Sequence, residues 1–211
     1  MQGAFITFEG GEGAGKSTII ENIATRLIAD NYDVIVTREP GGIPISEEIR
    51  EIILDKKNTM MDARTEALLY AAARRQHLVE KVIPALQKGK VVLCDRFIDS
   101  SLAYQGVARG LGMDQVYQIN QFAIEEYMPH LTLLLDITPE QGLARIKANG
   151  LREVNRLDVE EMSFHQNVYE AYHHLLKKFP ERIKKIDASS AIIKVEEQTY
   201  HVITNYLKDT N

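Results

Sequence analysis

A glycine-rich segment near the start of the chain has the residue types and spacing needed to bind phosphate. Residues 10–18 read GGEGAGKST and fit the pattern G-x-x-x-x-G-K-[ST], with Lys16 and Ser17 at its last two positions. Glycines allow successive backbone N–H groups to turn toward phosphate oxygens, the lysine reaches the outer phosphates, and the hydroxyl can bind Mg²⁺. A plain glycine turn is the alternative, but the segment lies between an apolar run and a helical pattern, which favours a phosphate-binding loop.

The expected ligands of this loop are ATP and Mg²⁺. We expect ATP to contact the whole segment, which comprises Gly10, Gly11, Glu12, Gly13, Ala14, Gly15, Lys16, Ser17 and Thr18. Ser17 is the expected hydroxyl ligand of Mg²⁺, and Asp95 is the expected acid because it ends the apolar run 91–94. A carboxylate in that position binds Mg²⁺ directly or through water, whereas helix capping is the other role open to it.

Two arginines also follow apolar runs. Arg38 comes directly after residues 34–37, and Arg96 comes directly after Asp95. Because ligands of a parallel sheet bind beyond the carboxyl ends of its strands, we expect both arginines to hold a second anionic group. Solvated surface ion pairs are the alternative for both side chains.

A second bound phosphate indicates phosphoryl transfer to a phosphate monoester. The monoester oxygen is already anionic near neutral pH, because its second pKa is about 6, so the reaction requires no general base. Lysine, arginine and Mg²⁺ would instead absorb charge in the transition state. The sequence contains no His-Arg-Asp loop of protein-kinase type and no Asn-Lys-x-Asp motif for reading guanine.

Further arginines lie in the segment GLARIKANGLREVNRLDVEE, residues 142–161. Its central part, at about 148–157, is predicted to be a short lid insertion between two helices. A closing lid would exclude water from the reaction and bring Arg152 or Arg156 to the donor phosphates. Both are therefore candidate catalytic residues, together with Lys16, Asp95 and Arg96. A solvated charged loop is the alternative for each lid arginine.

The spacing of apolar residues predicts an α/β fold. Runs rich in β-branched residues predict strands at 4–8, 34–37, 91–94 and 131–137, with a short fifth strand at 183–186. The first four of these strands are mostly apolar and alternate with helical patterns, which predicts a parallel sheet covered by helices on both faces. We therefore expect residues 1–211 to form a single domain with a three-layer P-loop NTPase fold and a five-stranded parallel sheet.

Three helices have recognisable boundaries. The alanine-rich run 62–88 predicts one long helix that crosses the fold, with a kink at Pro84 in its last turn. Asp158 followed by Glu161 resembles a capping box that opens a second helix. A last helix is expected at about 195–207.

The composition limits the partners that we expect. The 211 residues are 45% hydrophobic and 26% charged with a formal net charge of -5, and no block of like charge suggests binding to nucleic acid. A secretory signal pattern is absent and the apolar runs are too short to span a bilayer, so we expect no membrane association and a cytoplasmic location. The single cysteine, Cys94, is expected to be buried, and the histidines show no metal-ligand spacing.

The chain resembles the thymidylate kinase family over almost its whole length. The stretches that carry the resemblance are FITFEGGEGAGKST, TREPGG, LLYAAARRQH, DRFIDSSLAYQG and the lid segment. TREPGG and SLAYQG distinguish this family from adenylate-type kinases. The resemblance implies Mg²⁺-dependent transfer of a phosphoryl group from ATP to thymidine monophosphate (dTMP), which gives dTDP, and a homodimer packed through helices.

The resemblance also implies roles for individual residues in the acceptor site. Arg38 and Arg96 would hold the acceptor phosphate, and Glu12 would approach the 3'-hydroxyl of the deoxyribose. Arg74 would hydrogen-bond to the thymine ring while Tyr70 stacks on it. These last two residues are four apart on a predicted helix and therefore share a face, although a core position is the alternative for the tyrosine.

Three residues after Asp95 complete the implied site. Ser101, Tyr104 and Gln105 have the i, i+3, i+4 spacing of one helical face. By resemblance Ser101 and Gln105 would contact the edge of thymine, and Tyr104 would crowd the sugar carbon that carries the 2'-hydroxyl in a ribose. The phosphate loop contains no arginine, which resembles the bacterial arrangement in which the lid supplies the catalytic cation.

Two other functions remain open on sequence alone. The same lysine, acid and arginines would serve a small kinase that acts on a different nucleoside monophosphate. A nucleotide-responsive binding subunit without transfer activity would also need the phosphate loop, but it would not need two further arginines at the ligand end of the sheet.

Overall fold

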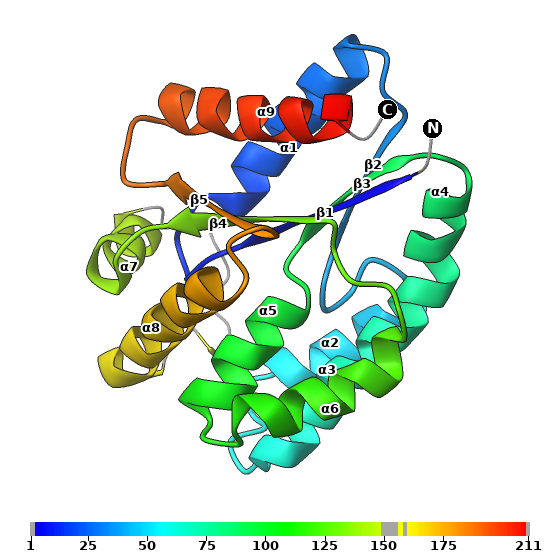
Figure 1. Ribbon diagram of the computed structural model, residues 1–211. Helices are drawn as coiled ribbons and strands as arrows, with labels where there is room; N and C mark the ends of the chain where they lie inside the picture. Colours follow the sequence, from blue (N-terminus) through cyan, green and yellow to red (C-terminus); the bar gives the residue numbers. More distant parts are fainter. Residues whose placement is uncertain (1–2, 149–155, 158–159, 210–211) are drawn as a thin grey trace.

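The computed structural model describes residues 3–148, 156–157 and 160–209. Five parallel strands form one sheet in the order β2-β3-β1-β4-β5 (Figure 1). Their bounds are β1 (Ala4–Glu9), β2 (Val34–Arg38), β3 (Val91–Asp95), β4 (Leu131–Asp136) and β5 (Ile183–Asp187). The predicted five-stranded parallel sheet is confirmed, with each strand within one residue of its predicted bounds.

Helices cover both faces of this sheet, as Figure 1 shows. On one face lie α1 (Lys16–Ala29) and α9 (Ile192–Asp209), and on the other lie α2 (Pro44–Leu54), α3 (Ala63–His77), α6 (Met113–Ile124) and α8 (Met162–Lys178). Neighbouring residues of β1 point to opposite faces, so Phe5 belongs to the core under α3 and α8, whereas Ile6 belongs to the core under α1 and α9. The sheet with one core and one helical layer on each face gives the three predicted layers.

The register of the central strands brings the predicted ligand residues together. Phe8 at the end of β1 lies opposite Asp95 at the end of β3, and Arg38 at the end of β2 lies opposite Asp95 on its other side. The phosphate loop follows β1 directly and leads into α1. The carboxyl ends of three adjacent strands therefore form one edge of the sheet, from which the site is built.

The run 62–88 does not form one continuous α-helix. Asp62 caps α3 by accepting hydrogen bonds from two backbone N–H groups, and α3 is followed by a π-helical segment, η1 (Leu78–Val82), and by α4 (Ile83–Gln87). Pro84 has no N–H to donate to the preceding turn, which is why regular α-helical bonding changes at this point.

The segment after β3 also departs from the predicted α-helical geometry. A single turn, α5 (Ile98–Ser101), leads into a second π-helical segment, η2 (Leu102–Ala108), in which the Arg109 N–H donates to the Tyr104 carbonyl at 2.8 Å. Tyr104 and Gln105 therefore lie on a wider turn than their i+3 and i+4 spacing from Ser101 suggests. π-helical segments of this kind are frequent at functional sites.

Two predicted helix boundaries are wrong. The helix α8 begins at Met162, and Glu161 is its N-cap residue without a side-chain hydrogen bond. Glu161 therefore precedes the helix and does not close the predicted capping box within it. Asp158 lies outside the described residues. The helix α9 begins at Ile192, earlier than predicted, and ends at Asp209. One more helix, α7 (Pro139–Ala148), precedes the predicted lid insertion.

Among the described residues, no helix combines the length and the apolar character needed to cross a membrane.

Candidate active site

A cavity of about 580 Å³ opens at the carboxyl ends of β1, β2 and β3. The predicted site residues that line it are Glu12, Gly13, Ala14, Gly15, Lys16, Ser17, Thr18, Arg38, Tyr70, Asp95, Arg96, Tyr104 and Gln105. The cavity therefore joins the phosphate loop to most of the predicted acceptor residues. Arg74 and Ser101 are buried behind its wall, and Arg152 lies outside the described residues.

The phosphate loop has the backbone conformation that its glycines allow. Gly15 has a φ of 85°, in the left-handed region, and forms the N-cap of α1. Gly13 has a φ of 72°, and a Cβ atom added to it would lie 2.1 Å from the Gly142 carbonyl oxygen of α7. Both positions therefore require glycine, and the N-terminus of α1 faces the cavity with its free N–H groups.

Lys16 is held beneath the loop. Its Nζ donates to the carbonyl oxygens of Gly10 and Gly11 at 3.1 and 3.2 Å. Burial, with a smaller contribution from the nearby charge of Arg96, lowers the pKa of Lys16 to about 8, against the opposing effect of Asp95, Glu12 and Glu9. A bound polyphosphate would stabilise the charged ammonium group, so the loop is built to receive an anion.

Ser17 and Asp95 provide adjacent oxygen atoms. Ser17 Oγ donates to Asp95 Oδ2 at 3.1 Å, and Asp95 Oδ1 is buried without a hydrogen-bond partner among the described residues. A buried acceptor without a partner fits a cation or a water molecule bound to one. Mg²⁺ commonly takes one or two protein oxygens and completes its shell with water and substrate phosphates, so these residues fit the predicted Mg²⁺ site.

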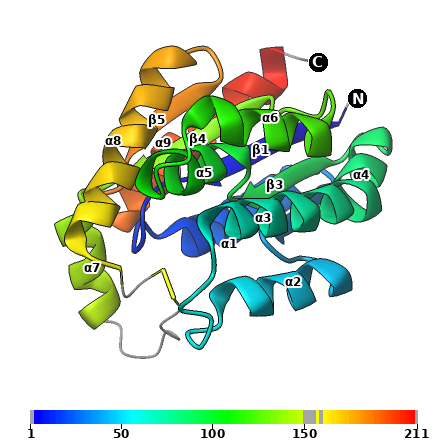
Figure 2. The same cartoon turned by 90° about the horizontal axis from the view of Figure 1, so that it is seen from below.

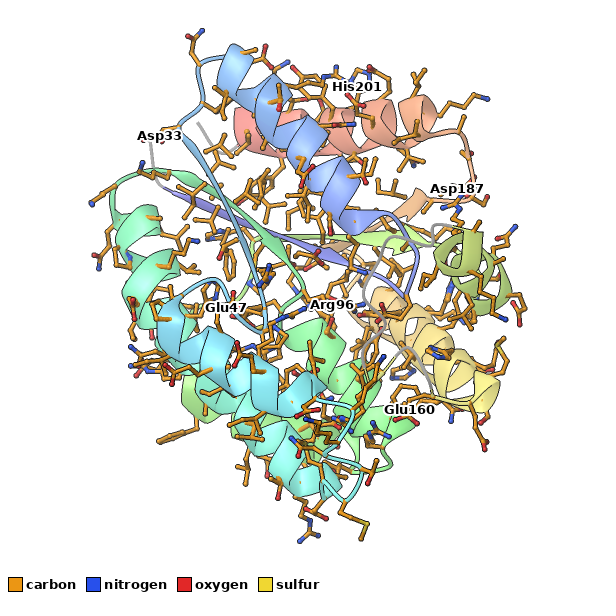
Figure 3. All side chains as sticks on the ribbon, turned by 180° about the vertical axis from the view of Figure 1, so that it is seen from behind. Asp33, Glu47, Arg96, Glu160, Asp187 and His201 are labelled. Carbon is orange, nitrogen blue, oxygen red and sulfur yellow. The ribbon has the colours of Figure 1, made fainter. Side chains whose placement is uncertain are left out.

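Arg96, which is labelled in Figure 3, lines the cavity beside the phosphate loop. Its guanidinium donates to Glu12 Oε1 at 2.8 Å, to Ser100 Oγ at 3.2 Å and to the Tyr172 hydroxyl at 3.3 Å. The backbone at Arg96 has a φ of 70°, in the left-handed region, while its N–H still donates to the Phe8 carbonyl. This conformation turns the side chain from the end of β3 toward the phosphate loop.

Arg38 and Arg50 form a second basic group in the cavity wall. Arg38 Nη2 donates to both carboxylate oxygens of Glu47 at 2.8 Å, and its side chain is 51% exposed. Arg50 of α2, which was not predicted, lines the same cavity and donates to the Pro40 carbonyl at 3.1 Å. Burial and the charge of Arg38 lower the pKa of Arg50. The surface ion pair considered for Arg38 is therefore present, on a side chain that also faces the cavity.

Arg74 is held behind the wall by a network of buried groups. The side chain is 2% exposed; its Nε donates to Glu39 Oε2 at 2.7 Å, and its Nη1 donates to Ser101 Oγ at 3.1 Å and to Asn120. Glu39 in turn is bonded through Oε1 to His77 Nδ1 at 2.9 Å. Glu39, His77 and Asn120 were not predicted, although Glu39 belongs to the TREPGG stretch.

Tyr70, Tyr104 and Gln105 form the wall in front of this network. Burial raises the pKa of the Tyr70 hydroxyl, so the ring enters the cavity as a neutral aromatic surface. Tyr104 donates its hydroxyl to Glu12 Oε1 at 3.0 Å, which ties the wall to the phosphate loop. The arrangement provides an aromatic face, an amide and an acid within one pocket.

Glu9 is a further buried acid that the sequence did not single out. It accepts hydrogen bonds from the Phe97 N–H at 2.8 Å, from the Ser100 hydroxyl at 2.5 Å and from the Tyr172 hydroxyl at 2.9 Å. Burial, with a smaller contribution from the charge of Asp99, raises the pKa of Glu9 to about 7. Glu9 thus supports the backbone on the C-terminal side of Arg96.

Arg156 lies away from the phosphate loop in this structure. It pairs with Glu66 of α3 and donates to the Ile53 carbonyl at 2.9 Å, while its neighbour Leu157 lines the cavity. These contacts attach residues 156–157 to α2 and α3.

Comparisons with known proteins assign the chain to a family. The family model described as thymidylate kinase matches residues 8–199. A thymidylate kinase of Oceanobacillus iheyensis is 63% identical over 209 residues, 99% of this chain and 93% of that protein, and one of Anoxybacillus flavithermus is 64% identical over 203 residues, 96% of this chain and 97% of that protein. The crystal structure of thymidylate kinase from Ehrlichia chaffeensis superposes with a TM-score of 0.77 at 30% identity and covers 96% of this chain and 99% of its own. The family model over residues 8–199 and these relatives show that this chain belongs to the thymidylate kinase family.

Proposed function

We propose that this chain transfers the γ-phosphoryl group of ATP to dTMP in line, giving dTDP as a step of dTTP synthesis. The family membership supports this activity, because the relatives that are 63% and 64% identical are thymidylate kinases. The structural observation that carries it is a single cavity lined by both the phosphate loop and a set of arginines from β2, β3 and α2. One pocket can therefore bring donor and acceptor phosphates together.

The donor end of the cavity would be assigned to ATP. Lys16 and the N–H groups at the start of α1 would position its phosphates. Ser17 and Asp95 would hold Mg²⁺, which supplies positive charge beside the transferring group when bound. Two observations support this assignment: Asp95 Oδ1 has no hydrogen-bond partner among the residues that the structure describes, and the pKa of Lys16 is lowered.

The acceptor phosphate would be held by Arg96 and Arg38, with Arg50 as an additional ligand. Both contacts of Arg38 to Glu47 use the same nitrogen, so its Nε and Nη1 can meet a phosphate without loss of that pair. Arg96 has five N–H donors and can likewise keep Glu12 while binding phosphate. A guanidinium matches the paired oxygens of a phosphate group in both places.

The nucleoside would lie against the wall formed by Tyr70, Tyr104 and Gln105. Tyr70 would stack on the thymine ring and Gln105 would contact its edge, beside Arg74 and Ser101. Glu12 would meet the 3'-hydroxyl, and Tyr104, bonded to Glu12, would occupy the space of a 2'-hydroxyl.

Two arginines are candidates for the catalytic cation of the predicted lid. Arg156 is held by Glu66 and by the Ile53 carbonyl, which supports an anchoring role for this side chain. Arg152 is the other predicted lid arginine and remains the candidate for contact with the transferring group. The lid itself, at about 148–157, remains a proposal.

The proposed homodimer would form through α2, α3 and α6. These helices lie side by side on one face of the molecule (Figure 2), and exposed apolar residues lie on each of them. They are Ile45, Ile52, Leu68, Tyr117 and Phe122. Phe122 is 89% exposed, which is unusual for an aromatic side chain outside a contact surface. A second copy of the chain is the partner that the resemblance implies.

The activity can be tested by measuring ADP formation with Mg-ATP in the presence and absence of dTMP. We expect ADP to form only when dTMP is present and in equal amount to dTDP. ADP formation at the same rate without an acceptor would contradict phosphoryl transfer to dTMP, and ATP binding without product would favour a binding subunit.

A further inference from the structure

Glu66 is a buried carboxylate with three hydrogen-bond donors around it. It lies on α3, and its side chain is 1% exposed. Gln105 Nε2 donates to Oε1 at 2.8 Å, and Arg109 Nε donates to the same oxygen at 3.3 Å. Arg156 Nη2 pairs with Oε2. Glu66 thus joins the cavity wall at Gln105 to the attachment of residues 156–157.

Glu66 is ionised in this environment. Burial alone would raise the pKa of Glu66, but the hydrogen bonds from Gln105 and Arg156 and the charge of Arg109 outweigh it and hold the pKa below its ordinary value. An ionised carboxylate can only accept hydrogen bonds. The group that faces it from Gln105 must therefore be the amide NH₂.

This requirement fixes the orientation of the Gln105 amide. The two ends of a glutamine amide have nearly the same shape but opposite hydrogen-bonding character, so neighbouring groups decide which end faces which way. With the NH₂ group committed to Glu66, the carbonyl oxygen Oε1 is the end that remains for a ligand. Gln105 lines the cavity beside Tyr70 and Tyr104, where the proposed base would lie.

We propose that Glu66 determines which pyrimidine the acceptor site takes, by holding Gln105 so that its amide offers a hydrogen-bond acceptor to the base. This inference rests on the proposed function. Thymine and uracil carry an N–H donor at ring position 3, which a carbonyl oxygen satisfies. Cytosine carries a lone pair at the same position, which would face the carbonyl oxygen without a proton between them. A site that leaves such polar groups unpaired rejects that ligand.

A purely structural role for Glu66 makes a different prediction. Glu66 and Arg109 also contact each other, and Arg109 pairs with Glu160 at 2.6 Å, so the cluster attaches the chain before α8 to α3. If attachment were the only role, loss of Glu66 would reduce the use of dTMP and dCMP by the same factor. The ratio of kcat/KM values for the two acceptors therefore separates the two roles.

The test compares Glu66→Gln with the double variant Glu66→Gln/Gln105→Glu. In the single variant, glutamine at 66 can either donate or accept a hydrogen bond, so the side-chain amide of Gln105 can rotate and exchange the positions of its oxygen and nitrogen. We expect the dTMP-to-dCMP ratio to fall by about tenfold or more, a change of the size that one base-reading contact provides. In the double variant, the carboxylate at 105 can only accept, with glutamine at 66 as its donor, so the ratio should return toward that of the unaltered chain.

Arg109→Gln is the matched control, because it weakens the ion-pair cluster but leaves the contact between Glu66 and Gln105 in place. Its dTMP-to-dCMP ratio should not change. Calorimetric titration of each variant with dTMP and with dCMP, without ATP, gives a second readout that does not depend on turnover. If Glu66→Gln does not fold, the double variant still decides the question, because loss of dTMP preference there would overturn the proposal.

Each failure has a distinct signature. An unchanged ratio in Glu66→Gln would overturn the role of Glu66 while leaving dTMP phosphorylation intact. An unaltered chain that does not prefer dTMP would instead overturn the proposed function.

Discussion

Arg96 and Glu12 form an ion pair, with 2.8 Å between Nη2 and Oε1, that joins the end of β3 to the phosphate loop. The Tyr104 hydroxyl donates to the same carboxylate oxygen at 3.0 Å. One acid therefore orients both the arginine proposed for the acceptor phosphate and the tyrosine proposed for the sugar. The side chains proposed to contact the phosphate and the sugar of the acceptor therefore both bond to Glu12.

Replacing Arg96 with lysine tests this relationship. Arg96→Lys keeps the positive charge and the same backbone cost at φ 70°, but it removes the planar fork that bonds to Glu12, Ser100 and the proposed phosphate. We expect kcat/KM for dTMP to fall by about 100-fold, with much less change in the KM for ATP. Steady-state kinetics measure both parameters. Arg26→Lys, in an exposed ion pair with Glu197, is the control and should show the activity of the unaltered chain; equal behaviour of the two variants would argue against the assignment of Arg96.

Lys16→Met should abolish turnover without unfolding the protein. Methionine occupies the space of the buried aliphatic chain of lysine but provides no positive charge beside the transferring phosphoryl group. We therefore expect the rate to fall by about 1,000-fold or more. The thermal midpoint should stay equal or rise, because burial of the ammonium group is unfavourable, as its lowered pKa of about 8 indicates. Calorimetry should still detect dTMP binding. A variant with near-normal turnover would refute the role of Lys16.

Removal of Mg²⁺, or of its proposed ligand Asp95, should stop or weaken the reaction. A chelator should abolish dTDP formation, and added Mg²⁺ should restore it. Asp95→Asn keeps the size of the side chain and can still contact Ser17, but it lacks the negative charge of the unpartnered Oδ1. We expect the Mg²⁺ concentration for half-maximal rate to rise about tenfold or more, because carboxylates dominate Mg²⁺ binding. The same half-maximal concentration in both proteins would remove Asp95 from the metal site.

Glu9 should make the folded protein less stable as the pH rises from about 4.5 to 7. Its pKa is raised to about 7 in the folded state, so over this range the folded protein keeps a proton that the unfolded chain has released. The stabilisation is complete below pH 4.5 and is lost as the pH passes through 7, by up to about 3 kcal/mol in the free energy of unfolding.

Denaturant unfolding at pH 5 and pH 7.5 measures this effect. Glu9→Gln cannot titrate but can still accept from the Phe97 N–H, so the difference in unfolding free energy between the two pH values should shrink in this variant. An identical difference in both proteins would show that Glu9 does not change its protonation on unfolding.

Phe122→Glu should convert the proposed dimer to a monomer. The side chain is 89% exposed on α6, and a buried charge without a partner at a helix interface opposes association. Sedimentation velocity measures the mass of both proteins. Ile193→Glu on α9, another exposed apolar position, is the control and should keep the mass of the unaltered chain. A monomeric unaltered chain would contradict the dimer itself.

The sheet and the contact between Ser17 and Asp95 could be predicted because their signals are local. The strands β1 to β4 are mostly apolar runs, and the residues that end those runs meet at one edge of a parallel sheet whatever the helices do. Ser17 and Asp95 are 78 residues apart in sequence, yet this rule alone places them together, and their hydroxyl and carboxylate lie 3.1 Å apart.

The contacts on the acceptor side were harder to predict from the sequence, because the packing of the helices determines which side chains meet there. Arg50 lies in an ordinary amphipathic pattern on α2, and only the position of that helix brings it to the cavity. Glu66 and Arg156 are 90 residues apart with no motif that relates them. We expected Arg152 or Arg156 to reach the donor phosphates, whereas in this structure the contact with Glu66 attaches Arg156 to α3. The wide turn at η2 was also missed, because the i, i+3, i+4 rule assumes α-helical bonding.

The most direct test of the proposed function is a competition in one tube. The purified chain would be incubated with Mg-ATP and equal concentrations of dTMP, dUMP, dCMP, AMP and GMP, and each nucleoside diphosphate would be measured together with free phosphate. The relative rates of diphosphate formation give the ratios of kcat/KM directly. We expect dTDP to form fastest, with little free phosphate; faster formation of another diphosphate, or release of phosphate without transfer, would contradict a dTMP-specific kinase.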